Sequence, residues 1–559
     1  MSFLLPKSQE RPNQRPPRRV EPASIIAIGS GKGGVGKTFM SITLASAMAQ
    51  AGRRTLLVDG DLGLANVDVQ LGIAPQTDLA AVIAGERRLS PEEALRLFRE
   101  ASLHALGRWS SAVADRIHGR AEDGGKRTYV IDRNINYTNV CSASCTFCAF
   151  FRKEGDDDAY VLTKEQLHDK VRELTAIGGT QVLLQGGMHP HLGVDFYVEL
   201  LRGLKAEFPQ VHIHGFSPPE FVEFVAVYEM AGFPTTDPRK SDEMGRDVWL
   251  AKLEAIMRLL MDAGLDSLPG GGGEVFAPHV RRRIGLGKAT ADQWLDVMAT
   301  AHKLGMKTSG TMMFGHIEGV ADRIDHMRRL RDRQDEAIAQ GWPGRYVSFI
   351  SWPFQRENTP LGNLPLYDYT EDGPFPGDTL ADQVFSGEVD GHDKKACGEA
   401  VPRAGKVVRM AGATDYLRTQ AVSRLFLDNF HSIGSSWVTM GPHIGEVALF
   451  FGANDMGSVM MEENVVSAAG TTYCLNEQLL CRLIRDAGFT PAQRDNGYNL
   501  LKVHGDDPAS PDLAVQDWST QRAQKLHVES DPGSCGSGGD GSSDAVKLTI
   551  TAGEKLPNN

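Results

Sequence analysis

The sequence predicts an α/β protein whose main domain is a closed parallel barrel, a (β/α)8 fold. The first observation is that eight apolar, strand-like runs alternate with amphipathic helical stretches. The second is that helix-start signals stand between these runs. Thr163 with Gln166 and Thr290 with Gln293 have the spacing of capping boxes. The same alternation of strands and helices could instead form an open, doubly wound sheet, which is the alternative fold.

The expected strands are residues 128–137, 181–187, 211–216, 266–270, 308–315, 346–351, 435–440 and 448–455. Each run is short and apolar, and a helical pattern separates it from the next. In a barrel of this kind the chemistry belongs at the C-terminal ends of the strands. The motifs that follow these runs are therefore the first candidates for a functional site.

The chain divides into four stretches of different composition. Residues 1–23 are rich in Pro and Arg and lack the apolar core of a signal peptide, which predicts a disordered arm. Residues 24–86 read as one compact α/β unit, and residues 87–505 hold the barrel. Residues 506–559 are polar and include GSCGSGGDGSSD, so a flexible tail is expected.

Composition narrows the classes of function. The 559 residues include 71 acidic and 59 basic side chains, and the net charge of −12 argues against a general nucleic-acid-binding role. No run approaches the roughly 18 apolar residues of a membrane-spanning helix, so stable membrane insertion is not expected. Seven cysteines do not make a disulfide framework, which favours a reducing compartment and a cytoplasmic protein.

A phosphate-binding loop follows the first apolar strand of residues 24–86. The run GKGGVGKT at residues 31–38 satisfies the P-loop pattern and precedes a helix rich in Ala, Leu and Met. In this motif backbone N–H groups cradle phosphate, the lysine reaches it and the threonine ligates magnesium. The expected nucleotide contacts are Gly33, Gly34, Gly36, Lys37 and Thr38.

Lys32 and the run TLLVDGDLGLANVD at residues 55–68 resemble the deviant Walker ATPases of the MinD/ParA family. The resemblance implies Mg-ATP as a ligand and places Asp61 near the magnesium ion. The family's second acidic strand is missing after residue 86. The unit is therefore interpreted as a truncated ATPase fragment ahead of an enzyme, and an ATPase switch acting through partners is the alternative function.

Three of the seven cysteines lie close together in CSASCTFCAF at residues 141–150. Structural zinc needs four Cys or His ligands, and no histidine lies near enough in the sequence. A redox pair of Cys145 and Cys148 leaves Cys141 unexplained. Three thiolates can instead hold three corners of a 4Fe-4S cluster and leave the fourth iron open. Zinc and redox chemistry remain the alternatives.

The pattern C-x3-C-x-Phe-C after the first barrel strand resembles the radical S-adenosylmethionine (SAM) superfamily. The resemblance implies that Cys141, Cys145 and Cys148 bind a 4Fe-4S cluster whose open iron binds SAM. It places Phe147 near the adenine, and the turn Gln185–Gly186–Gly187 near the methionine amino group. An electron donor such as flavodoxin or ferredoxin is implied as a partner.

Longer motifs narrow the resemblance to the cyclic dehypoxanthinyl futalosine synthase family of menaquinone biosynthesis. They include RNINYTNVC at 133–141, LQGGMHP at 184–190, SWPFQRENTPL at 351–361 and MMEENVVSAAG at 460–470. The resemblance implies conversion of the small molecule dehypoxanthine futalosine to its cyclic form. Aminofutalosine synthase and the deazaflavin synthases share the cysteine loop and the QGG turn, so they remain alternatives.

Polar residues at the strand ends are candidates for contact with the ligands. The carboxylates expected to accept a proton are Glu274, Asp455 and Glu462, with Glu463 beside them. His214 and His316 end strands and are candidates for contact with substrate or SAM. Trp352 and Trp437 are expected to shield the site from water. Each also has an ordinary structural interpretation, as a solvated charge, a satisfied histidine or a core aromatic.

Overall fold

The computed structural model describes residues 37–53, 79–237, 243–370 and 373–518. The chain splits into two compact units, Met1–Ala80 and Ala81–Asn559. In the first unit the structure describes helix α1 (Lys37–Gln50), which confirms the helix expected after the P-loop. Gly52 follows it with a φ of 76°, a conformation that glycine adopts without strain.

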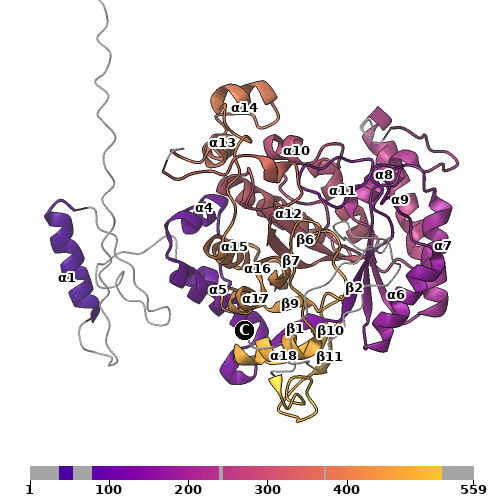
Figure 1. Cartoon of the computed structure of the whole chain (residues 1–559). Helices are drawn as coiled ribbons and strands as arrows, with labels where there is room; N and C mark the ends of the chain where they lie inside the picture. Colours follow the sequence, from indigo (N-terminus) through magenta and orange to yellow (C-terminus); the bar gives the residue numbers. More distant parts are fainter. Residues whose placement is uncertain (1–36, 54–78, 238–242, 371–372, 519–559) are drawn as a thin grey trace, which may run out of the picture. The chain divides into compact units, whose positions relative to one another are not determined.

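The second unit is built on one 11-stranded sheet (Figure 1). Every strand pairing in it is parallel, except that β10 and β11 are antiparallel. The strands are β1 (Lys126–Val130), β2 (Asp132–Asn136), β3 (Gln181–Gln185), β4 (His212–Gly215), β5 (Ser267–Leu268), β6 (Lys307–Phe314), β7 (Arg345–Pro353), β8 (Ser432–Gly434), β9 (Asp455–Ser458), β10 (Thr490–Arg494) and β11 (Leu500–Val503).

The sheet closes into a barrel because β1 and β2 are two halves of one chain segment. β1 pairs with β9 and β2 pairs with β3. The N–H of Thr128 bonds to Asn454 on the β9 side, whereas the carbonyl of Ile131 accepts from Thr180 on the β3 side. The segment formed by β1 and β2 therefore has β9 beside its first half and β3 beside its second half, and β1 also pairs with β10 on its outer edge. The predicted parallel (β/α)8 fold class is confirmed.

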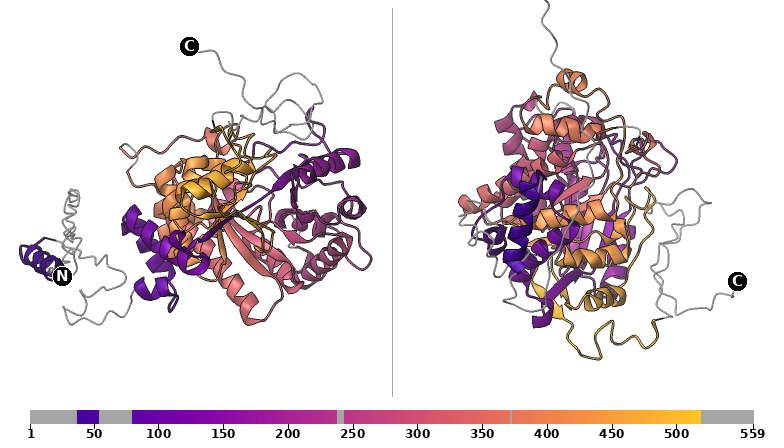
Figure 2. Two further views of the ribbon diagram at one scale, coloured as in Figure 1. Left: turned by 90° about the horizontal axis from the view of Figure 1, so that it is seen from below. Right: turned by 90° about the vertical axis from the view of Figure 1, so that its left-hand side faces the viewer.

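Helices surround the sheet, as Figures 1 and 2 show. The α-helices of the second unit are α3 (Leu79–Ala84), α4 (Pro91–Glu100), α5 (Leu103–His118), α6 (Lys164–Ala176), α7 (Val194–Glu207), α8 (Pro218–Val227), α9 (Arg246–Ala263), α10 (Pro278–Ile284), α11 (Ala291–Lys303), α12 (Val320–Ala339), α13 (Pro376–Phe385), α14 (Lys394–Ala400), α15 (Ala413–Phe426), α16 (Trp437–Met440), α17 (Pro442–Val447) and α18 (Glu477–Asp486). Short 3-10 turns span Ala121–Asp123, Leu361–Asn363 and Ala448–Phe450.

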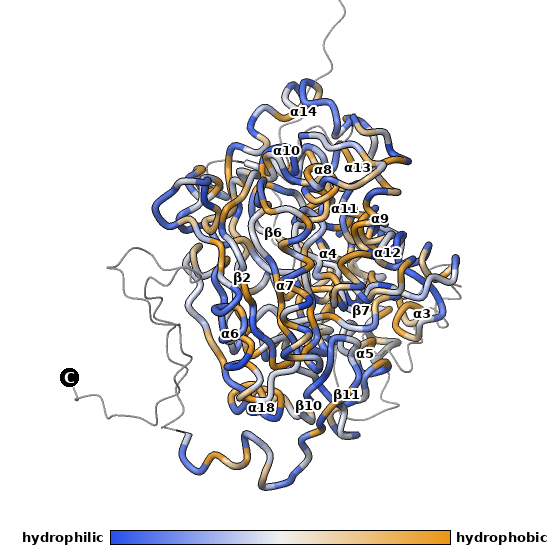
Figure 3. The backbone as a smooth tube through the Cα atoms, turned by 90° about the vertical axis from the view of Figure 1, so that its right-hand side faces the viewer, coloured by the Kyte–Doolittle hydropathy of each residue, from blue (hydrophilic) through white to orange (hydrophobic). Residues whose placement is uncertain are grey.

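Local signals explain where these helices begin and which face they bury. Thr163 accepts a hydrogen bond from the N–H of Gln166, and Thr290 from that of Gln293, so both predicted capping boxes are confirmed. Hydrophobic and hydrophilic stretches alternate along the helices (Figure 3). In α7, for example, Tyr197, Leu201 and Leu204 are buried at helical spacing. None of the helices that the structure describes is long and apolar enough to cross a membrane.

The last two predicted strands are wrong in position. The run at 435–440 contains α16, and the strand β8 precedes it. The run at 448–455 begins with a 3-10 turn, and β9 starts only at its end. Short apolar runs fit a buried strand and a buried helical turn equally well, which is why periodicity did not separate them.

The barrel unit extends beyond both predicted boundaries. At its start, Val82 of α3 is buried, and Arg116 donates to the carbonyl of Ala84. At its end, Asp512 is buried and accepts a hydrogen bond from Arg485 of α18. Part of the stretch expected to be a flexible tail therefore packs against the barrel.

Candidate active site

A cavity of about 470 Å³ lies inside the barrel. This volume is in the range of small-molecule sites. Among the residues that line it, the following were singled out from the sequence: Cys141, Cys145, Phe147, Cys148, Gln185, Gly186, Gly187, His214, Glu274, Trp352, Trp437, Asp455 and Glu463. The fold thus brings most of the predicted site residues to one cavity.

Two predicted residues, Glu462 and His316, are not among those that line the cavity. The Glu462 carboxylate is buried and forms ion pairs with Arg133 (2.7 Å) and Lys170 (2.9 Å). Burial alone would raise the pKa of Glu462, but the two cations lower it, so this carboxylate is a poor proton acceptor. Glu462 was expected to accept a proton and His316 to contact substrate or SAM. Both expectations are corrected, because the two side chains are buried outside the cavity.

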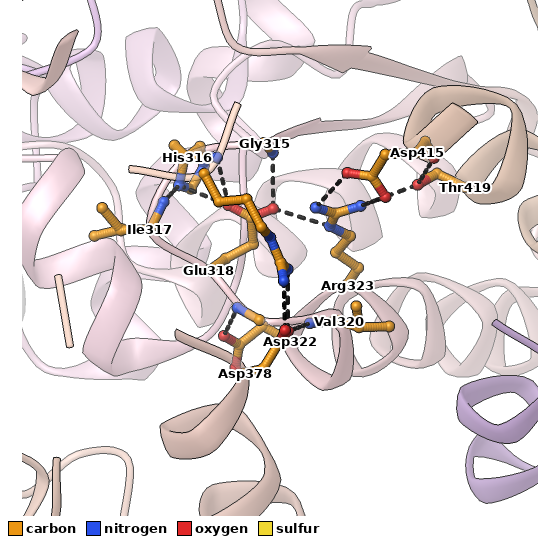
Figure 4. A network of polar contacts seen from close by, with 12 residues as sticks. Gly315, His316, Ile317, Glu318, Val320, Asp322, Arg323, Asp378, Asp415 and Thr419 are labelled. Carbon is orange, nitrogen blue, oxygen red and sulfur yellow. Dashed lines mark hydrogen bonds and ion pairs between the residues drawn. The ribbon is translucent and has the colours of Figure 1, made fainter. Parts of the chain in front are cut away.

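His316 belongs to a buried network at the end of β6, shown in Figure 4. Its Nδ1 accepts the N–H of Ile317, and its backbone N–H donates to Glu318. Glu318 also accepts from Gly315 and from Arg323 Nε, and Arg323 donates in turn to Asp415 and Thr419. This network ties the end of β6 to helices α12 and α15.

The predicted nucleotide contacts cannot be placed in the same way. Gly33, Gly34, Gly36 and Asp61 lie outside the described residues. Lys37 and Thr38 begin α1, but their side chains also lie outside what the structure describes. The phosphate site of the first unit therefore stays a prediction.

The cysteine loop lies directly against the QGG turn. Gly187 allows this approach, because a Cβ there would stand 2.0 Å from the carbonyl oxygen of Val140. The N–H of Met188 donates to the Sγ of Cys141 at 3.3 Å. Burial raises the pKa of all three thiols, that of Cys145 to about 11, so they need a positive partner to ionise.

The donor set fits an iron–sulfur cluster better than a single metal ion. Within the described part of the chain, no group of three or more His, Cys, Asp and Glu side chains could hold one metal ion. A 4Fe-4S cluster takes each thiolate on a different iron, so its ligands do not converge on one point. Cys141, Cys145 and Cys148 share one wall of the cavity, together with Met188 and Phe147, as such a cluster requires.

The glycine-rich loop after β5 places a charged pair beside the cysteines. Glu274 has a positive φ of 36°, and its Oε1 accepts from Lys288 Nζ at 2.7 Å. Lys288 also stands 4.9 Å from the ring centroid of Phe147, and Arg281 lies 3.6 Å from Glu274. Glu274 is therefore held by two cations, which makes it a positioning group for this loop.

Glu220 was not singled out from the sequence, although it lines the cavity. Its Oε1 accepts from the N–H of Gly186 (3.1 Å) and from the hydroxyl of Tyr137 (2.7 Å), and its Oε2 accepts from Ser217. Burial raises the pKa of Glu220 to about 7. Glu220 thus fixes the QGG turn. The sequence signal that could have identified Glu220 is its position three residues after Ser217, which is the spacing of a capping box.

The remaining carboxylates of the cavity differ in their partners. Asp455 accepts two hydrogen bonds from Arg494, at 2.5 and 2.9 Å, and one from Thr128. Glu463 instead accepts from two backbone N–H groups, at 2.7 Å each, and from Asn134 Nδ2 at 2.9 Å. Glu463 forms no ion pair with any described residue, and burial raises its pKa.

Family models match three parts of the chain. The Radical SAM superfamily matches residues 135–330, and the CofH/MqnC C-terminal region matches residues 395–506. The CobQ/CobB/MinD/ParA nucleotide binding domain matches residues 26–216, a range that overlaps the start of the barrel. The first two matches include the cysteine loop, the QGG turn and the segment that holds Asp455 and Glu463, but not β7, which also lines the cavity.

Named relatives are similar over most of the barrel. Cyclic dehypoxanthine futalosine synthase of Halalkalibacterium halodurans is 37% identical over 78% of this chain and 98% of its own length. The enzyme of that name from Streptomyces coelicolor is 35% identical over 76% of this chain and 88% of its own. A 5-amino-6-(D-ribitylamino)uracil–L-tyrosine 4-hydroxyphenyl transferase of Methanopyrus kandleri is 34% identical over 79% of this chain and 97% of its own.

The fold also occurs among solved structures. Methylornithine synthase (PylB) aligns with a TM-score of 0.50 and 16% identity, over 74% of this chain and 97% of its own. The barrel, the cysteine loop and the family match together define a radical SAM enzyme, which uses a 4Fe-4S cluster and SAM. Within that superfamily, the chain belongs to the family of cyclic dehypoxanthine futalosine synthase and its CofH/MqnC relatives.

Proposed function

We propose that the protein converts dehypoxanthine futalosine to its cyclic form in the futalosine route to menaquinone. The observation that carries this proposal is the pair of relatives with that name, of which this chain covers 98% and 88%. The competing reaction is that of the 34% identical transferase. Because the identities are close, a comparison of the two substrates distinguishes the two reactions.

Residues of the cavity wall would hold the two cofactors. Cys141, Cys145 and Cys148 would bind the cluster, and the QGG turn with Phe147 would hold SAM beside it. When bound, the cluster and SAM supply a carbon-centred radical that removes a hydrogen atom from the sugar. A low-potential donor such as flavodoxin or ferredoxin would deliver the electron that starts each turnover.

The protein's own contribution to this chemistry is enclosure and proton removal. Trp352 and Trp437 line the cavity. Their indole rings would exclude water and other hydrogen donors, and the enclosed cavity would hold the reacting atoms close together. Ring closure onto a benzoate ring leaves one electron, which the oxidised cluster or the protein electron carrier would accept, and one proton to be removed. Among Glu274, Asp455 and Glu463, Glu463 is proposed as the proton acceptor, because no cation of the described residues pairs with it and burial raises its pKa.

A second candidate function concerns the first unit alone. Its match to a nucleotide binding domain favours binding of Mg-ATP at the P-loop. We propose that this unit makes no contribution to the barrel chemistry. Removing residues 1–78, which leaves α3 intact, is expected to leave turnover unchanged, whereas turnover that depends on ATP would reverse this proposal.

The experiment that tests the main proposal is a comparison of substrates. Anaerobically reconstituted enzyme with SAM and a reductant is given dehypoxanthine futalosine, or 5-amino-6-(D-ribitylamino)uracil with tyrosine, or an enolpyruvyl benzoate. The proposal predicts a product of dehypoxanthine futalosine that has lost two hydrogen atoms. Turnover of only one of the other two mixtures would assign a different reaction.

A further inference from the structure

One wall of the cavity carries amide side chains from two neighbouring strands, among them Asn134 of β2 and Gln181 of β3. Side chains of a strand alternate between its two faces, and the residues of β2 and β3 that line the cavity follow this alternation. They are Asp132, Asn134, Asn136, Gln181, Leu183 and Gln185. In the register of the pair, Asp132 lies opposite Gln181 and Asn134 lies opposite Leu183. Asn134 and Gln181 are therefore diagonal neighbours on the inner face.

The nitrogen atoms of both amides are already used. Asn134 Nδ2 donates to Oε2 of Glu463 at 2.9 Å, and Gln181 Nε2 donates to Oδ2 of Asp132 at 3.1 Å. The other oxygen of Asp132 accepts from the hydroxyl of Ser458. Because a carboxylate accepts hydrogen bonds, each amide must turn its nitrogen towards its acid. This fixes the direction in which each amide oxygen points.

The two amide oxygens have no partner. Asn134 Oδ1 and Gln181 Oε1 are buried and accept no hydrogen bond from any described residue. Both side chains are about 4% exposed, so bulk solvent does not satisfy them. A buried acceptor without a donor is unfavourable and rare in folded proteins. Since both residues line the cavity, the donors for these oxygens are expected to come from a ligand.

We propose that Asn134 and Gln181 form a subsite that accepts hydrogen bonds from two hydroxyl groups on the sugar portion of the substrate. The neighbouring acids Asp132 and Glu463 make this wall unfavourable for a carboxylate or phosphate. Hydroxyl groups supply donors without adding a negative charge. The identification of the sugar as a ribose rests on the proposed function.

The subsite does not depend on which reaction of the family the protein catalyses. A futalosine derivative carries a ribose, and the name of the transferase relative contains a ribityl group, which is also a chain of hydroxyls. Both would offer neighbouring hydroxyl donors to the same wall. The subsite would thus recognise what the two substrate classes share, while other walls of the cavity distinguish them.

The test is a binding measurement on the full-length holoenzyme with SAM and no reductant, so that no turnover occurs. Calorimetric titration compares dehypoxanthine futalosine with its analogue that lacks the 2′- and 3′-hydroxyls. In Gln181→Met and Asn134→Leu we expect the Kd of the full substrate to rise roughly tenfold. The Kd of the analogue and that of SAM are expected to stay unchanged.

A matched control is available on β10. Gln493 is a buried glutamine of the same sheet that does not line the cavity, and its amide donates to the carbonyl of Gly178. Gln493→Met is expected to change neither Kd. An equal loss for substrate and analogue in Gln181→Met would show a structural role, and unchanged binding would show that water alone satisfies the amides. Either result overturns the subsite.

Failure of the proposed function would be distinguishable from failure of the subsite. If the wild-type enzyme does not bind dehypoxanthine futalosine, the titration is repeated with 5-amino-6-(D-ribitylamino)uracil. Binding of that compound which weakens in Gln181→Met but not in Gln493→Met would support the subsite while refuting the cyclase. Binding that is indifferent to Gln181 would overturn the subsite as well.

Discussion

The cavity wall and the network at the end of β6 both contain buried polar groups, but the charged groups of the network are paired, and its His316 Nε2, which has no partner among the described residues, does not line the cavity. In the network of Figure 4, Glu318 and Arg323 each satisfy several partners. Burial alone would raise the pKa of Glu318, but His316 and Arg323 lower it. In the cavity wall, Asn134 and Gln181 keep an oxygen without a partner.

This difference separates what holds the fold from what serves a ligand. Removing one member of a satisfied buried pair leaves an uncompensated charge, which costs stability. An unsatisfied group in a cavity contributes little to the fold and becomes useful only when a ligand arrives. Substitutions in the cavity wall should therefore reduce function at nearly constant stability, and those in the network should do the reverse.

The largest effect is expected for Cys145→Ala. Losing one of three thiolate ligands opens a second iron and makes the cluster labile, so SAM cleavage should be abolished. Iron content, the visible spectrum and formation of 5′-deoxyadenosine measure this. Cys397→Ala is the control, because Cys397 is also buried but lies in α14. A full cluster and normal SAM cleavage in the Cys145 variant would refute the assignment of the cysteines.

The network should respond in stability. Arg323 is 1% exposed and pairs with Glu318 and Asp415, so Arg323→Met should lower the free energy of unfolding by about 3–5 kcal/mol. Arg328 on the same helix pairs with the partly exposed Asp325 and the exposed Asp332, and Arg328→Met should cost less than about 1 kcal/mol. Denaturant titration checks both values. Equal losses in the two variants would contradict the comparison.

A rate effect without a stability effect is expected for Glu463→Gln. The amide cannot accept the proton, so cyclic product should form about 10²-fold more slowly while 5′-deoxyadenosine continues to appear. Because burial raises the pKa of Glu463, the wild-type rate should fall as the pH drops through that raised pKa. Glu274→Gln is the control and should keep the ratio of the two products. A normal ratio in the Glu463 variant would exclude it as the base.

The smallest effect concerns the stability of the barrel at acidic pH. Burial lowers the pKa of His302 to about 3, and its Nε2 lies 2.7 Å from the Thr308 hydroxyl. The charged imidazolium is disfavoured only in the folded state. The full free energy of unfolding is therefore present above about pH 6.5, and part of it is lost as the pH falls towards 3. At pH 5 the loss of unfolding free energy is roughly 2 kcal/mol. His302→Gln should flatten the pH dependence of unfolding, and an unchanged slope would contradict this.

Sequence patterns predicted the barrel and the helix caps, and most of the barrel residues that they singled out line the cavity, because strand periodicity and strand-end motifs act locally. They could not distinguish Glu462 from Glu463, since adjacent residues in a loop point in directions that only the packed structure decides. Glu462 meets Arg133 and Lys170, whereas Glu463 reaches the cavity. The partners of an acid come from distant parts of the chain, and they determine whether it can act as a base.

Deuterium transfer tests the proposed reaction most directly. Dehypoxanthine futalosine carrying deuterium at carbon 4′ of its ribose is incubated anaerobically with the reconstituted enzyme, SAM and a reductant, and both products are examined by mass spectrometry. We expect the deuterium to appear in 5′-deoxyadenosine in step with formation of the cyclic product. Cyclic product without deuterium in 5′-deoxyadenosine would contradict hydrogen abstraction from carbon 4′.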